Sequence, residues 1–457
     1  MINTIHNDYN KWDLIWRRIK DCVDGQDAVK TGRDLYLPML NGQDLELYER
    51  YLQRAQFVNF VGRTLNIALG QIFRKNPVVE NIDEDYINDI NLDGQNLYYF
   101  SRDITSEVAK YNRCGILVDW SDEQQRPYLI KYSTFEIINW KEEKVNGIMQ
   151  PAYIILQGYV EKEKDKYETE NVKMYRVLEL EEGRYVTRVY EEAKGKESAK
   201  ERFVLIDERV PVKNGKPFEY IPFFFFTSNG LSTKIEKSIL YDMVNVNLGH
   251  YINSADYENM LHWTGAKTLV TKGYAKETVP IGGSFNLPVD GDAMYLEASS
   301  DSGLRDEMQK KKEDMAVMGA TLISGQGRYI ASAETARINS SGEYASLADL
   351  SKSMSMCMSS VMREFVDWSG GKADKVSIEF NTDYELAQLD PAILTAYMGA
   401  VQSRYMSKKT FFYNMKNFEL YPPDWTEEDE FKAIEEENHM EEIEIDEEDI
   451  SQNQDED

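Results

Sequence analysis

The most regular hydrophobic pattern of this 457-residue chain lies between Ile235 and Trp263, a stretch with no proline and one glycine, Gly249. Apolar residues recur there every three or four positions along two adjacent stripes, one beginning at Ile235 and the other at Leu240. This spacing predicts one long helix, of about 44 Å at 1.5 Å per residue. Two apolar stripes need partners on two sides. The helix is therefore either a buried core helix or a helix packed between copies of itself.

After this helix the hydrophobic pattern becomes that of short β segments and then returns to a helical period. Short β segments are expected at residues 266–271, 283–287 and 293–296, between prolines and glycines. A second helix is predicted over 303–323, with Asp306 and Glu307 in its first turn, where the helix dipole favours acids. A third is predicted over 334–369. Because glycine costs about 1 kcal/mol in a helix interior, we expect a kink at Ser340–Gly342.

The sequence before the long helix predicts a body of helices and strands, and the sequence after the third long helix predicts a helical module. Helices are expected at 9–24, 44–75 and 97–112, and strands between 127 and 226. Alternation on both sides of Glu182-Gly183 predicts a hairpin over 175–190, and Ile221–Phe226 reads as a strand buried on both faces. A strand over 375–381 and helices near 390–406, 408–417 and 426–437 follow. The fold class is α+β.

Charge narrows the range of possible partners. The formal net charge is −28, and residues 427–457 contain 17 acids and one lysine. Such a chain does not hold nucleic acid phosphates tightly, although it can still handle DNA without gripping it. The acidic end cannot bury enough apolar surface to fold alone, so residues 441–457 are predicted to be a disordered tail.

No catalytic motif is visible, so we expect no enzyme, no cofactor and no metal. The three cysteines lie far apart, and the four histidines (His6, His250, His262 and His439) form no zinc-ligand pair. His250 and His262 are read as packing or interface residues. No P-loop, signal peptide or membrane-length apolar run is present. The loop Gly325–Arg328 alone has the glycines and the cation to approach a phosphate closely, although its residues by themselves favour a plain flexible turn.

The order of these segments, together with several strings, resembles the portal proteins of tailed bacteriophages. The resemblance covers nearly the whole chain before the acidic tail, and it rests on the joint order of the strings rather than on one of them. The two most specific strings are LGHYINSADYENMLH (248–262) and ETARINSSGEYASL (334–347). The others are IKDCVDGQDAVK with YLPML (19–40), YERYLQRAQFVNFVGRT (48–64), FRK (73–75), GILVDW (115–120) and IPF (221–223).

The resemblance implies a ring-forming, portal-type protomer with a defined division of the chain. It comprises an α/β wing (1–235), a stem helix (236–263), a β-containing clip (264–302), a second stem helix (303–323), a tunnel loop (324–333), a long kinked helix (334–369), a wing strand (370–388), crown helices (389–440) and the tail (441–457).

The resemblance also implies a function and partners. The ring, of twelve subunits in typical members and then about 636 kDa for a 53.0 kDa chain, would sit at one capsid vertex of the virion after assembly in the host cytoplasm. Double-stranded DNA would pass through it in packaging and ejection without sequence specificity. Its partners would be other copies of itself, the terminase large subunit, a head–tail adaptor, and the major capsid and scaffolding proteins, with no membrane.

Residues facing DNA follow from the same resemblance. The tunnel-loop candidates are Gly325, Gln326, Gly327, Arg328 and Tyr329. Lys310, Lys311 and Lys312 of the second stem helix are weaker candidates, because three consecutive lysines point in different directions and a solvated face or ion pairs between subunits explain them better. Candidates for polar edges of the first stem helix, facing the tunnel or outward, are Asn247, Asn253, Asp256 and Asn259. Two alternatives stay open: another ring-forming head–tail connector or adaptor, and a nucleic-acid-processing enzyme.

Overall fold

The computed structural model describes residues 1–145, 147–193, 202–265, 268–272, 289–296, 302–323, 333–382, 384, 391–417, 420–421 and 425–436. The chain divides into two compact units, Met1–Thr382 and Asp383–Asp457. The predicted tunnel loop, the β segment at 283–287 and the acidic tail lie outside the described residues. No helix of the described part is long and apolar enough to cross a membrane.

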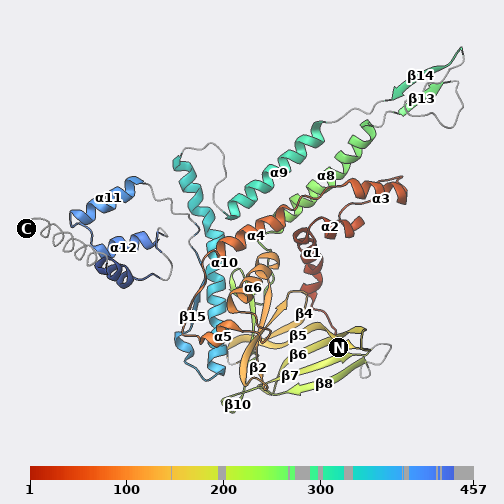
Figure 1. The fold of residues 1–457 in the computed structure, drawn as a ribbon. Helices are drawn as coiled ribbons and strands as arrows, with labels where there is room; N and C mark the ends of the chain where they lie inside the picture. Colours follow the sequence, from red (N-terminus) through yellow and green to blue (C-terminus); the bar gives the residue numbers. More distant parts are fainter. Residues whose placement is uncertain are drawn as a thin grey trace, which may run out of the picture. The chain divides into compact units, whose positions relative to one another are not determined.

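The first unit begins with helices that pack against one another and against the later long helices (Figure 1). These are α1 (Asn7–Asp24), α2 (Gln26–Thr31), a 3₁₀ turn (Arg33–Leu35), α3 (Leu45–Arg54), α4 (Phe60–Ile72), the short α5 (Glu84–Asn88) and α6 (Leu97–Tyr111). Side-chain caps fix their starts: Asp44 accepts from the Leu47 amide and Asn96 accepts from the Tyr99 amide.

Two antiparallel sheets form the β part of this unit. A five-stranded sheet has the order β4-β5-β6-β7-β8, and a four-stranded sheet has the order β12-β11-β2-β3. The strands of the first are β4 (Ile137–Val145), β5 (Ile148–Glu163), β6 (Thr169–Glu181), β7 (Arg184–Glu192) and β8 (Phe203–Arg209). Those of the second are β2 (Cys114–Ser121), β3 (Arg126–Ser133), β11 (Phe223–Thr227) and β12 (Gly230–Leu231).

Several strand predictions are confirmed. Strands β6 and β7 form the expected hairpin, and both residues of its turn, Glu182 and Gly183, have positive φ. Positive φ at both central residues is the requirement of a type I′ turn. Strand β11 is largely buried, as its apolar sequence predicts.

A buried ion pair joins the two sheets. Arg176 of β6 pairs with Asp119 of β2, and Arg176 also donates to the Tyr132 hydroxyl of β3. Asp119 accepts in addition from the Trp120 amide at 2.9 Å. Because a charge without a partner inside a protein is strongly destabilising, the guanidinium and the carboxylate each depend on the other.

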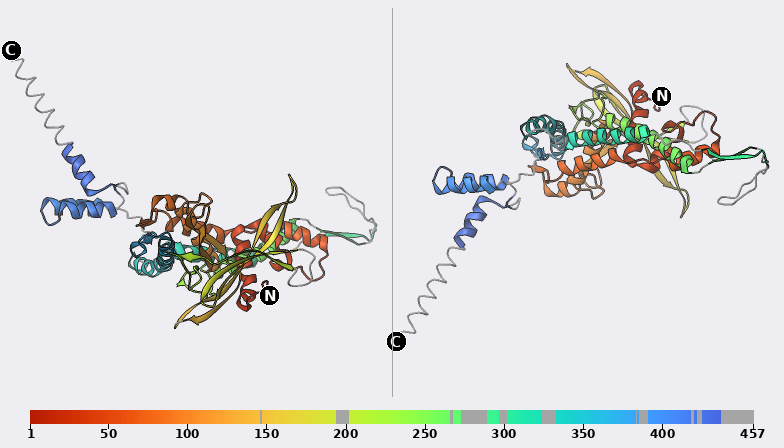
Figure 2. Two further views of the ribbon diagram at one scale, coloured as in Figure 1. Left: turned by 90° about the horizontal axis from the view of Figure 1, so that it is seen from below. Right: turned by 90° about the horizontal axis from the view of Figure 1, so that it is seen from above.

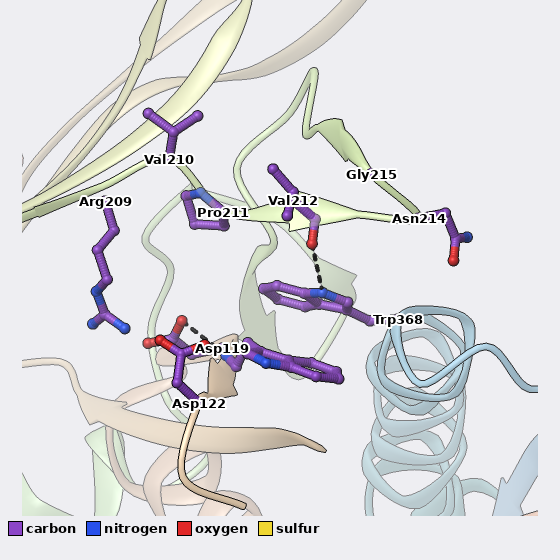
Figure 3. A pocket seen from close by; sticks show the side chains of 10 residues that line it. Asp119, Asp122, Arg209, Val210, Pro211, Val212, Asn214, Gly215 and Trp368 are labelled. Atoms are coloured by element: carbon purple, nitrogen blue, oxygen red, sulfur yellow. Dashed lines mark hydrogen bonds between the residues drawn. The ribbon is translucent and has the colours of Figure 1, made fainter. Parts of the chain in front are cut away.

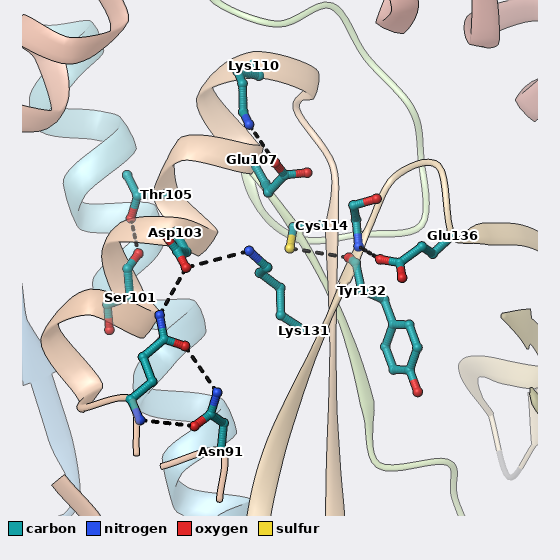
Figure 4. A network of polar contacts seen from close by, with 12 residues as sticks. Asn91, Ser101, Asp103, Thr105, Glu107, Lys110, Cys114, Lys131, Tyr132 and Glu136 are labelled. Atoms are coloured by element: carbon teal, nitrogen blue, oxygen red, sulfur yellow. Dashed lines mark hydrogen bonds and ion pairs between the residues drawn. The ribbon is translucent and has the colours of Figure 1, made fainter. Parts of the chain in front are cut away.

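Helix α6 is tied to the four-stranded sheet by a polar network (Figure 4). Asp103 of α6 accepts from the Gln95 side chain at 3.0 Å and lies 3.7 Å from the Lys131 ammonium of β3. Glu107 pairs with Lys110 within the helix at 2.6 Å. The network fixes the start of α6 over strand β3.

Three long helices follow the sheets. They are α8 (Tyr241–Gly265), α9 (Ser302–Ile323) and α10 (Ala333–Trp368), and strands β13 (Thr268–Lys272) and β14 (Asp292–Leu296) form an antiparallel ribbon between α8 and α9. Helix α10 is one continuous helix; the kink at Ser340–Gly342 stays a prediction.

The long helix predicted from Ile235 begins at Tyr241, six residues late. Residues 235–240 are not helical, because neighbouring groups hold the chain there in another conformation. Asn112 donates to the Lys237 carbonyl, and Arg113 donates to the Thr233 carbonyl at 2.8 Å. The apolar stripe that began at Ile235 is therefore shorter than predicted.

Helix α10 carries a row of polar side chains that pairs with a strand, which we call the serine ladder (Ser351, Ser355, Ser359 and Arg363). Its partner is β15 (Ser377–Glu379), whose other edge pairs with β1 (Val78–Glu80). Ser359 donates to the Ile378 carbonyl and accepts from the Ile378 amide, at 3.2 and 2.9 Å. Ser351 donates to the Asn381 carbonyl, Ser355 accepts from the Phe380 amide, and Arg363 donates to the Val376 carbonyl. The ladder therefore satisfies a strand edge that no second strand pairs within the described residues.

The remaining small elements are the β9–β10 hairpin (Val212–Lys213 with Lys216–Pro217) and a 3₁₀ turn at Ala373–Lys375. The second unit, taken by itself, contains α11 (Pro391–Gln402), α12 (Lys408–Asn417) and a helical stretch over 427–436. These positions agree with the three helices predicted there.

Candidate functional site

The candidate site is the pair of helices α8 and α9 with the ribbon that connects them. The two helices lie side by side in every view (Figures 1 and 2), and they pack on each other and on the N-terminal helices. From Met243 to Ala255, every third or fourth residue of α8 is buried, which gives an inner stripe along the first part of the helix. The stripe comprises Met243, Val244, Asn247, His250, Tyr251, Ser254 and Ala255.

Polar members of that stripe bind the connection between α3 and α4. The Asn247 side chain donates to the Val58 carbonyl at 2.9 Å and accepts from the Phe60 amide at 3.3 Å. Ser254 accepts from the Gln56 amide at 2.9 Å and donates to the Gln56 carbonyl at 2.7 Å. These side chains give the backbone of the α3–α4 connection tertiary hydrogen bonds in place of helical ones.

This geometry corrects the prediction of one helix over 44–75. The chain forms α3 and α4 with a non-helical connection at residues 55–59, because α8 offers partners for the backbone there. The hydrophobic periodicity of residues 44–75 contains no information about these hydrogen-bond partners on a distant helix. The polar residues Asn247 and Ser254, seven positions apart in an apolar stripe, were the available signal.

The predicted polar edge of α8 is also corrected. Asn247 is fully buried, Asp256 accepts from the Tyr51 hydroxyl at 2.6 Å, and Asn259 accepts from Arg54 at 3.1 Å. These three face the N-terminal helices rather than a tunnel or open solvent. Asn253 is half-buried.

The contact between α8 and α9 is close at Gly249. A Cβ atom there would lie 3.3 Å from Lys311 Cε, so the lysine stem covers the glycine. Lys311 pairs with Glu307 one turn earlier at 2.7 Å. Of the three predicted stem cations, Lys310 is exposed, Lys311 lies in this helix contact and Lys312 is half-buried.

His250 is buried without a hydrogen-bond partner. Its side chain is 1% exposed, and neither ring nitrogen has a partner among the described residues. Burial, together with the charges of Lys312 and Lys311, lowers the pKa of His250 to about 4. The imidazole is therefore neutral at pH 7, and His250 is a packing residue as predicted.

Both helices of the pair keep apolar residues in contact with solvent. Ile252 and Leu261 of α8 and Val317 of α9 are 37%, 41% and 41% exposed. Met308 and Met318 of α9 are half-buried. A helix pair that already buries one side against its own chain thus also has an exposed apolar surface, made of these residues.

The structure does not place the predicted DNA-facing loop. Gly325, Gln326, Gly327, Arg328 and Tyr329 all lie outside the described residues. Within the described part, no group of three histidine, cysteine, aspartate or glutamate side chains is arranged to hold a metal ion.

Comparisons with known proteins give one family match and several distant structural likenesses. The model of a domain of unknown function (DUF4055) matches residues 239–369, which is less than a third of the chain and spans α8 to α10. No curated protein matches.

Among solved structures, the chain is similar to a chain of the "neck of native GTA particle computed with C12 symmetry". The TM-score is 0.38 at 10% identity, with 79% of this chain and 90% of that chain covered. It is also similar to a chain of the "neck of empty GTA particle computed with C6 symmetry". There the TM-score is 0.40 at 11% identity, with coverages of 83% and 95%. Likenesses at this level carry no argument about function.

Proposed function

We propose that this chain is the subunit of a portal-type ring, which forms the DNA channel at one vertex of a tailed-phage-like capsid. The single observation that carries the proposal is the insert α8–ribbon–α9, followed by the long α10, with exposed apolar residues left on both helices of the pair. This is the order of elements that the sequence resemblance implies. In a ring, the exposed apolar residues of one subunit's helix pair pack on the neighbouring subunits.

The electrostatics support a channel through which DNA slides. Each phosphate that a protein neutralises adds salt-dependent affinity, so a ring that must let a duplex pass needs few close cations. The chain has a net charge of −28, and Lys311 is already paired with Glu307. The DNA contacts that we propose are those of the loop Gly325–Tyr329, with Lys310 and Lys312 as secondary ones.

The proposal is tested by native mass spectrometry and electron microscopy of the purified chain. We expect closed rings of one size, with twelve subunits and an open centre. A chain that stays monomeric at all concentrations contradicts the proposal. A magnesium-dependent nuclease activity in the same preparation would favour the enzyme alternative instead.

A second experiment addresses the loop. Deleting Gly325–Ala331 should leave ring assembly intact and reduce the amount of DNA packaged or retained in assembled particles. Loss of the ring in this variant would show that the segment belongs to the subunit interface and not to the channel. The terminase, the head–tail adaptor and the capsid and scaffolding proteins remain the proposed partners of such a ring in the virion.

A further inference from the structure

The two edges of the five-stranded sheet differ in how they are protected. Edge strands expose unpaired backbone groups, and proteins usually shield them with charges, bulges or a covering segment. Strand β4 has all three. Residues 141–144 are charged and exposed, and its pairing with β5 is irregular at two places. The N-terminal chain covers its beginning, since the His6 amide donates to the Ile138 carbonyl at 2.9 Å and Asn139 donates to the Thr4 carbonyl.

Strand β8 is the less protected edge. Its sequence begins with Phe203 and continues with three apolar residues, Val204, Leu205 and Ile206, which are 50%, 45% and 50% exposed. It ends the strand order of its sheet, and within the described residues no strand pairs with its outer side. Its pairing with β7 skips Ile206, so a bulge protects its middle, and the charged residues Asp207, Glu208 and Arg209 protect only its end. Three consecutive exposed apolar residues on an edge strand mark a place where another strand can pair.

A pocket opens where this strand ends (Figure 3). It has a volume of about 530 Å³, and the chain from Arg209 to Val212, directly after β8, forms one wall. Trp120 and Trp368 lie stacked beneath that wall, with ring centroids 6.1 Å apart. The Trp368 indole donates to the Val212 carbonyl at 3.1 Å, which fixes the pair in place. The edge strand and the pocket are thus continuous along the chain.

The charges of the pocket indicate what kind of side chain it accepts. Asp119 forms an ion pair with Arg176, and Arg209 forms one with Asp207 at 2.8 Å. Asp122 is exposed, and none of the ion pairs of the described residues involves it. A carboxylate without a counter-ion beside an indole ring suits a lysine or arginine side chain, through charge and cation–π attraction together.

We propose that β8 and this pocket form a docking site for an extended segment of a partner protein. The segment adds a sixth strand to the sheet beside β8 and places a lysine or arginine side chain in the pocket against Asp122 and the tryptophan pair. Main-chain hydrogen bonds to the strand supply affinity, and the pocket supplies specificity. The site goes beyond the proposed channel and does not depend on it.

The test uses fluorescein-labelled octapeptides of alternating valine and threonine, titrated with the full chain and followed by fluorescence anisotropy. A peptide with arginine at both ends should bind at least tenfold more tightly than one with glutamate at both ends. The arginine peptide with N-methylated central residues should lose binding, because it cannot pair with a strand edge. Absence of binding by the arginine peptide at millimolar protein, or equal binding of its N-methylated form, would overturn the proposal.

Variants locate the site. The double variant Val204→Lys/Ile206→Lys should abolish binding, and Asp122→Asn should remove the preference for arginine over glutamate. The matched control is Tyr159→Lys/Val160→Lys, which changes two exposed residues of β5 in the same sheet and should bind as the parent does. Equal binding by the β8 double variant would refute the site. If that variant instead breaks the chain's own assembly, a second copy covers the edge, and the assignment to a partner protein is wrong.

Discussion

At the scale of single residues, His250 is the clearest case of a buried polar group kept without a partner. An unsatisfied buried polar group costs on the order of 1–3 kcal/mol, and replacing it with an apolar group of similar shape can be stabilising. Protonation is harder still, because the ring lies near Lys311 and Lys312. The α8–α9 contact therefore depends on the imidazole staying neutral.

This gives a pH prediction. The pKa of His250 is about 4 in the folded chain and 6.5 for an ordinary histidine, so the unfolded state binds its proton first as the pH falls. The stability from the neutral imidazole is complete above about pH 6.5 and is lost between there and pH 4, by roughly 3 kcal/mol. His250→Leu should be at least as stable at pH 7 and should lose less stability on acidification.

Urea unfolding of both proteins from pH 4 to 7 checks the prediction. The difference between the two curves isolates His250, because the carboxylates titrate in both proteins. Parallel curves would show that the imidazole is solvated or finds a partner in solution.

At the scale of elements, the α3–α4 connection depends on α8. Asn247 supplies two hydrogen bonds to it from a fully buried position. Asn247→Ala removes both and leaves the Val58 carbonyl and the Phe60 amide unpaired, which should cost about 2–4 kcal/mol of unfolding free energy. Asn245→Ala, an exposed position two residues away on the same helix, should change stability by less than about 0.5 kcal/mol. Chemical denaturation of the two variants measures both unfolding free energies. Equal small decreases would mean that the hydrogen bonds of Asn247 to the α3–α4 connection are not formed.

The serine ladder gives a second comparison between neighbouring residues. Ser359 is buried and holds both backbone groups of Ile378, whereas Ser360 is half-buried and bonds only to the Met356 carbonyl of its own helix. Ser359→Ala should destabilise the chain by about 1–3 kcal/mol, and Ser360→Ala should be nearly neutral. Hydrogen exchange at the Ile378 amide should accelerate in the first variant alone. Unchanged exchange there would contradict the assignment of the ladder.

These elements show what sequence periodicity can and cannot give. The positions of α9, α10, the β6–β7 hairpin and β11 follow from local patterns, and the structure has them within a few residues. The break between α3 and α4 and the late start of α8 do not. In both cases side chains distant in sequence (Asn247 and Ser254, or Asn112 and Arg113) bind a backbone that would otherwise be helical. The contact of the α10 serines with β15 could likewise not be predicted, since a serine that faces solvent and one that faces a strand look alike in sequence.

The candidate site also has features that the sequence predicts and features that depend on tertiary packing. The helix–ribbon–helix order was visible from periodicity, whereas the inward direction of Asn247 and Asp256 and the covering of Gly249 by Lys311 depend on helix packing. The pocket lined by Trp120 and Trp368 was not predicted. Its parts come from β2, the end of β8 and the end of α10, so no window of sequence contains them.

At the scale of the whole molecule, the exposed apolar surface of the α8–α9 pair carries the assembly proposal. Ile252→Lys/Val317→Lys puts one charge on each helix of that surface and should reduce assembly at least tenfold while the chain stays folded. Leu14→Lys/Leu45→Lys, which changes two exposed leucines of α1 and α3, is the matched control and should assemble as the parent does. Sedimentation velocity with circular dichroism measures both properties. Normal assembly of the first variant would remove this surface from the proposed interface.

The serine ladder also determines how the first unit bears mechanical load. The chain leaves that unit at Thr382, directly after β15, and continues into the second unit. A force directed along β15, which runs antiparallel to α10, strains the ladder contacts in shear at the same time rather than peeling them one by one. Bonds loaded together in shear withstand more force than bonds opened in sequence. The row of small hydroxyls on α10 thus shares such a load with the pairing of β15 to β1.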